Sequence, residues 1–67
     1  KMKHYIVNLS SFTNEKATEL YKALRAYAYD VYTIANQPNV YEVFWENSND
    51  TIQKLCHIPS QFIKTIN

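Results

Sequence analysis

The sequence predicts a small α+β domain in the order strand, long helix, strand and short helix, with a small sheet completed by the C-terminal segment or by dimerisation. Three observations predict this class. The chain has 67 residues, the size of a single domain over residues 1–67. Two short runs of β-branched and aromatic residues flank one long stretch with apolar residues at helical spacing. Glycine is absent, so positions with positive φ fall to asparagine.

The first predicted elements are a strand over residues 4–9 and a helix from about residue 14 to 35. In the strand, alternation places three residues on one face: Tyr5, Val7 and Leu9. Thr13 is the expected N-cap of the helix, because its hydroxyl can accept an unpaired backbone N–H. Asn36 can take the left-handed conformation at the end of the helix, and Pro38 prevents the helix from continuing.

The second predicted strand covers residues 40–46, and a short helix follows over residues 52–57. One face of the strand carries Tyr41, Val43 and Trp45, and the other carries Val40, Glu42, Phe44 and Glu46. Polar residues 48–51 supply a cap for the short helix, and Pro59 ends it. Residues 60–67 fit either a short amphipathic helix, which we favour, or an edge strand.

The two strands and the helix between them are expected to form a right-handed crossover. Such a unit makes the strands parallel and covers one face of the sheet. Two strands are too few to form an independent sheet. A third strand from the C-terminal segment or a second copy of the chain should therefore complete it, and we expect a homodimer.

Helical geometry divides the side chains of the long helix between two surfaces. At 100° per residue, the core stripe consists of Leu20, Leu24, Tyr27, Val31 and Ile34. A flank of the same helix carries a set that we call the Tyr/Arg ridge: Tyr21, Arg25, Tyr29 and Tyr32. Tyrosine and arginine are enriched at interface hot spots, so the ridge is the predicted partner-binding site. The alternative is that these rings cover the edge of the protein's own core.

A second candidate surface is the sheet face opposite the long helix. Ile6, Val40 and Phe44 lie there among polar residues, and apolar residues on an uncovered face mark an association site. We expect this face to serve dimerisation. The alternative is that the short helix or the C-terminal segment folds over it.

No catalytic or metal-binding pattern accompanies these surfaces. Cys56 and His57 are neighbours on a helix, where they point about 100° apart and do not form a nucleophile–base pair. The two histidines and the cysteine lack the spacing of a metal site. Glu42 and Glu46 share a strand face about 13 Å apart, too far for a carboxylate pair. We therefore predict no enzyme activity, no cofactor and no bound metal.

Charge and composition narrow the class of partner. The net charge of +1 argues against a strongly electrostatic nucleic-acid binder. No apolar run approaches the roughly 18 residues of a membrane span, and a single cysteine suits a reducing compartment, here the cytoplasm.

The resulting prediction is a small non-enzymatic regulator or inhibitor that binds another protein by steric contact. Richness in Asn, Ile, Lys and Tyr suits an origin in a phage or mobile element of an AT-rich host. The alternative is a single-stranded nucleic-acid-binding protein that stacks bases on the same tyrosines. For the preferred function, Tyr29→Ala should leave the fold intact and weaken association.

Overall fold

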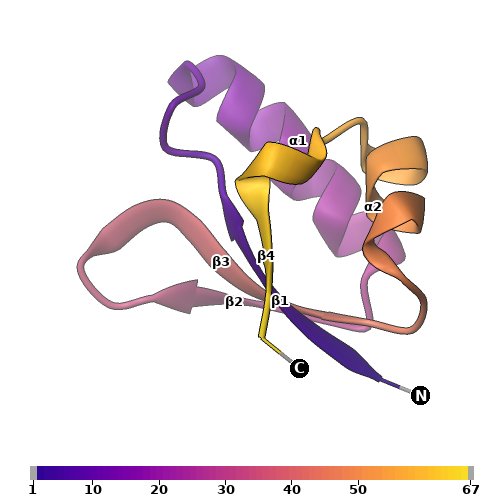
Figure 1. Cartoon of the computed structure of the whole chain (residues 1–67). Coiled ribbons are helices and arrows are strands. Elements are labelled where there is room, and N and C mark those ends of the chain that lie inside the picture. The colour runs from indigo at the N-terminus through magenta and orange to yellow at the C-terminus, as the bar shows by residue number, and fades with distance from the viewer. Residues whose placement is uncertain (1, 67) are drawn as a thin grey trace.

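The computed structural model describes residues 2–66 and, of residue 49, the backbone only. The chain folds into an α+β domain, as the sequence predicts (Figure 1). Its elements, in order, are β1 (Lys3–Asn8), α1 (Asn14–Tyr27), β2 (Asp30–Ile34), β3 (Gln37–Trp45), α2 (Asn49–Cys56), the 3-10 helix η1 (Ser60–Phe62) and β4 (Ile63–Thr65). Among the described residues, neither α1 nor α2 has the length and apolar character to cross a bilayer.

The sheet has four strands in the order β2-β3-β1-β4, and each neighbouring pair is antiparallel. Because β1 and β2 are both antiparallel to β3, they run in the same direction with β3 inserted between them. This is the split βαβ arrangement of a β-α-β-β-α-β chain. The expectation that the strand over residues 40–46 would be parallel to the first was wrong, because β2 takes the parallel position.

The long helix predicted to reach Ala35 ends at Tyr27, and that prediction was wrong. Ala28 is already extended, with φ −74° and ψ 155°, and its N–H closes the last helical turn on the Leu24 carbonyl. Residues 29–34 are mostly β-branched or aromatic, so they lose rotamer freedom in a helix and favour a strand. Asn36 has the expected positive φ of 63°, but it lies in the turn between β2 and β3.

The C-terminal segment supplies the edge strand that was the alternative to a helix. β4 pairs with β1 in antiparallel register, with Val7 opposite Ile63. Only Ser60–Phe62 forms a helical turn, so the favoured amphipathic helix was wrong. The sheet is thus completed within one chain, through the first of the two routes that the sequence predicted.

Both helices lie on the same side of the sheet (Figure 1). Their buried residues form one core with the inward face of the strands, made of Tyr5, Val7, Leu9, Ala17, Leu20, Leu24, Val31, Val43, Trp45, Ile52, Cys56, Ile58 and Ile63. Leu20 and Leu24 are in the core, as predicted. Tyr27 is 56% exposed, contrary to its assignment to the core stripe, because the helix ends there. Val31 is buried, but it reaches the core from β2.

Candidate protein-binding surface

The four residues of the Tyr/Arg ridge do not share one helix flank. Tyr21 and Arg25 lie on α1, Tyr29 lies in the connection that follows, and Tyr32 lies on β2. The ridge was predicted from helical spacing beyond residue 27, where the chain is no longer helical. As a continuous surface of one helix, the ridge is therefore wrong, and each residue has its own surroundings.

Tyr21 packs against the protein itself. Its ring centroid lies 4.8 Å from that of Tyr41 on the inward face of β3, with an angle of 34° between the ring planes. Tyr21 and Tyr41 are both half-buried against the core. This position matches the alternative that the sequence left open, in which the ring covers the edge of the core.

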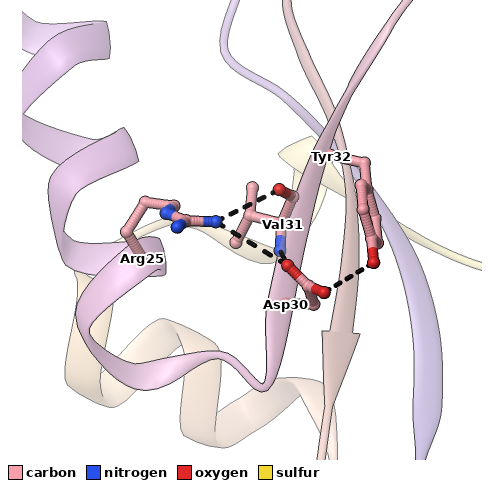
Figure 2. A network of polar contacts seen from close by, with 4 residues as sticks. All are labelled: Arg25, Asp30, Val31 and Tyr32. Atoms are coloured by element: carbon pink, nitrogen blue, oxygen red, sulfur yellow. Dashed lines mark hydrogen bonds and ion pairs between the residues drawn. The ribbon is translucent and has the colours of Figure 1, made fainter.

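Arg25 is bonded to the edge strand β2 (Figure 2). Its guanidinium donates a hydrogen bond of 3.4 Å to the Val31 carbonyl and lies 3.7 Å from Asp30 Oδ1. The same carboxylate oxygen accepts the Val31 N–H at 3.0 Å, and Asp30 Oδ2 accepts the Tyr32 hydroxyl at 2.6 Å. Side chains therefore bond both the N–H and the carbonyl of Val31, and these groups are then not available for pairing of β2 with a strand of another chain.

We use the term open face for the side of the sheet opposite the two helices. Strand residues alternate between the faces, and those that alternate with the core residues point here. The open face carries Asp30 and Tyr32 from β2, Val40, Glu42 and Phe44 from β3, His4, Ile6 and Asn8 from β1, and Lys64 from β4. The predicted dimer residues Ile6, Val40 and Phe44 are all on it, and neither helix covers it within residues 2–66.

Three rings form the centre of the open face. His4 stacks on Phe44, with ring centroids 4.5 Å apart and planes inclined by 12°. Tyr32 meets Phe44 edge-on, at 5.9 Å and 84°. The rings therefore follow one another across β1, β3 and β2, and Tyr32 remains 50% exposed. Aromatic pairs in these geometries attract each other beyond the burial of their area, so the rings are held in place.

Two aliphatic residues flank the rings. Val40 is only 6% exposed although it lies outside the main core. Ile6 is half-buried and lies opposite both Glu42 on β3 and Lys64 on β4.

Acidic and basic residues are divided between the two halves of the open face. Asp30 and Glu42 lie on β2 and β3, whereas His4 and Lys64 lie on β1 and β4. His4 Nε2 is 3.3 Å from Glu42 Oε2, a distance suited to an ion pair, but it makes no hydrogen bond to any described residue. The hydrogen bond that Tyr32 donates to Asp30 raises the pKa of the phenol, because ionisation would place two negative oxygens together.

Sequence reasoning found only part of this surface. It placed His4 beside the predicted dimer residues, as the structure does, but it missed Lys64, and it placed Asp30 and Tyr32 on a helix. The alternation of side chains in residues 30–34 was the signal that could have placed the last two. Tyr29, from the ridge, is 75% exposed at the connection between α1 and β2.

The residues considered for chemistry do not converge. Cys56 is buried in the core, where desolvation raises the pKa of its thiol, while the adjacent His57 is exposed with a left-handed backbone. Within the described residues, no three of His, Cys, Asp and Glu lie close enough to hold a metal ion. No pocket opens on this part of the chain.

Comparison of the chain with protein-family models, with curated proteins and with solved structures found no match. Function is therefore argued from the geometry of the open face.

Proposed function

We propose that this chain is a small non-enzymatic protein-binding regulator or inhibitor that acts by steric contact through its open face. One observation carries the proposal: three packed rings and the side chain of Ile6 lie on a sheet face that neither helix covers. Apolar and aromatic side chains gathered on an uncovered face are typical of association surfaces. A cytoplasmic location and an origin in a phage or mobile element belong to the same proposal, on the grounds of composition.

The rings are suited to binding because they are already ordered. Phe44 contacts both His4 and Tyr32, and the Tyr32 hydroxyl is bonded to Asp30. Each immobilised side chain otherwise subtracts about 0.5–1.5 kcal/mol from the free energy of binding. A partner would meet a prearranged surface, which fits steric occlusion of another protein's surface.

Nucleic acid is the second candidate, because open four-stranded sheets with exposed aromatic side chains can stack single-stranded bases. The charges of the open face favour protein instead. Asp30 and Glu42 flank Tyr32 and would repel phosphate, whereas the basic groups on this face are Lys64 and His4. Stacking without a basic groove lacks the electrostatic contribution that supplies most non-specific affinity.

Photo-crosslinking tests the proposed surface. A benzophenone amino acid replaces Tyr32 in one variant and Tyr29 in a matched control, since both tyrosines are exposed but only Tyr32 is on the open face. In lysate of the source cell, position 32 should capture a discrete protein, and Ile6→Lys should abolish that capture. Capture from position 29 alone would place the binding surface elsewhere.

Oligonucleotide binding separates the two candidates. A fluorescent single strand is titrated with the protein at low salt and again at higher salt. Affinity that falls log-linearly with salt and requires Tyr32 would establish the nucleic-acid function. Absence of oligonucleotide binding at low salt would exclude the nucleic-acid function.

A further inference from the structure

The charges of the open face are arranged so that the face complements itself. Its acids, Asp30 and Glu42, belong to β2 and β3, and its bases, His4 and Lys64, belong to β1 and β4. The strand order β2-β3-β1-β4 therefore separates an acidic half from a basic half along one line across the sheet. A surface divided in this way can pair with a second copy of itself after a half turn.

We propose that a second copy of the chain covers the open face, related by a twofold axis parallel to the strands. This inference rests on the proposed function, because it names the partner that the same surface accepts in the isolated protein. With this axis, β2 lies over the second copy's β4 and β3 over its β1, so each acidic half meets a basic half. Sheets that pack face to face keep their strands aligned within about 30°.

The sheet register gives the contacts of this pairing. Tyr32, Glu42, Ile6 and Lys64 form one row across the four strands. The half turn places the second copy's Lys64 over Tyr32, beside Glu42 and within reach of Asp30. A lysine over a tyrosine ring is a cation–π contact, and the flanking carboxylates add charge attraction.

The neighbouring row and the other choice of axis support the same arrangement. In the row of Phe44 and His4, the half turn stacks the Phe44 ring of one copy near the His4 ring of the other. An axis across the strands would instead lay β2 over β2, with acid facing acid. Like charges placed opposite each other disfavour that arrangement by several kcal/mol.

The size of the face sets the expected strength of the dimer. The four strands lie about 4.8 Å apart and β1 has six residues of about 3.3 Å each, which gives a face roughly 20 Å on a side. Two such faces bury roughly 800–1,000 Å² in total, which is below the roughly 1,200 Å² of stable specific interfaces and in the range of weak, transient ones. We therefore expect a Kd on the order of 10–100 µM. A partner protein would have to displace the second copy from this surface.

Charge reversal combined with sedimentation equilibrium tests the pairing, over about 10 µM to 1 mM protein. Lys64→Glu makes the open face mainly acidic and Glu42→Lys makes it mainly basic, so each variant should dimerise at least about tenfold more weakly than wild type. An equimolar mixture of the two variants should form the heterodimer. The matched controls are Lys54→Glu on α2 and Glu19→Lys on α1, exposed positions on the helical side of the sheet, and neither should weaken the dimer.

Three outcomes would overturn the inference: a monomer throughout this range, a Lys64→Glu homodimer as strong as wild type, or a loss of affinity in the controls equal to that in the open-face variants. Circular dichroism of every variant separates lost pairing from lost folding. Failure here is distinguishable from failure of the proposed function. If the chain is strictly monomeric but position 32 still captures another protein, the dimer proposal is refuted and the proposed protein-binding function stands.

Discussion

The Arg25 guanidinium on α1 donates a hydrogen bond of 3.4 Å to the Val31 carbonyl on β2. It joins the helix to β2, an edge strand that no other strand within residues 2–66 covers on that side. Asp30 Oδ1 accepts a hydrogen bond from the Val31 N–H, and Asp30 Oδ2 accepts one from the Tyr32 hydroxyl on the open face. One polar network therefore protects the edge and positions an exposed ring, which favours recognition through the open face over strand addition at β2.

Replacement of Arg25 should destabilise the domain modestly. Arg25→Ala removes the bond to Val31 and the contact with Asp30, and we expect the free energy of unfolding to fall by about 1 kcal/mol. The ion pair adds little of this, because both side chains are at least a third exposed and water screens them. Urea unfolding measures the change. Lys22→Ala, an exposed position of the same helix, is the matched control for helix propensity, and an equal loss there would deny Arg25 this role.

Tyr21 and Tyr29 should respond in opposite ways to truncation. Tyr21→Ala removes a half-buried ring that packs against Tyr41 and should lower the free energy of unfolding by about 2–3 kcal/mol. Tyr29 is 75% exposed, so Tyr29→Ala should change the free energy of unfolding by less than about 0.5 kcal/mol.

The earlier expectation that Tyr29→Ala weakens association stays a prediction. The competing prediction is that the open face, which does not include Tyr29, is the contact surface. If Tyr29→Ala proves more disruptive to binding than Tyr32→Ala, the α1–β2 connection is the contact surface.

The sequence predicted the fold class, both strands 4–9 and 40–46 in outline, the N-cap at Thr13 and the short helix. These elements have strong local signals, such as the alternation of Tyr5 and Val7 or the Thr13 hydroxyl, which accepts the Lys16 N–H at 3.1 Å. Local signals were sufficient where propensity and packing agree.

The missed hairpin had a weaker local signal, the alternation of side chains in residues 30–34, which competes with a helical spacing. Helical spacing continues beyond the end of α1, through Leu20, Leu24, Tyr27 and Val31. No glycine or proline near Ala28 marks the point where the helix ends. The pairing of β2 with β3 decides the structure of residues 30–34, and helical periodicity does not reveal such a pairing. Tyr32 was consequently assigned to a helix flank, while the predicted dimer residues Ile6, Val40 and Phe44 were correctly grouped because they depend on strand alternation alone.

The contact between Trp45 and Thr51 should fix the start of α2. The indole Nε1 donates to the Thr51 hydroxyl at 2.6 Å, and that hydroxyl donates to the Ser48 carbonyl at 2.7 Å. Thr51→Val keeps the shape but leaves the indole N–H without its acceptor, and should lower the free energy of unfolding by about 1–3 kcal/mol. Fluorescence of the chain's single tryptophan reports the change directly. Thr18→Val on α1, whose hydroxyl only bonds its own helix, is the control.

The domain should lose stability in alkaline solution. Desolvation is the first cause that raises the pKa of Tyr5 and of Tyr41 above the ordinary value of 10.0. Each phenol thus binds its proton more tightly in the folded chain, so its contribution is fully present below pH 10.0 and is lost as pH rises through the raised pKa. Urea unfolding at pH values from neutral to alkaline should show the decline, and Tyr41→Phe should make it shallower. A decline as steep in Tyr41→Phe as in the wild type would contradict the assignment.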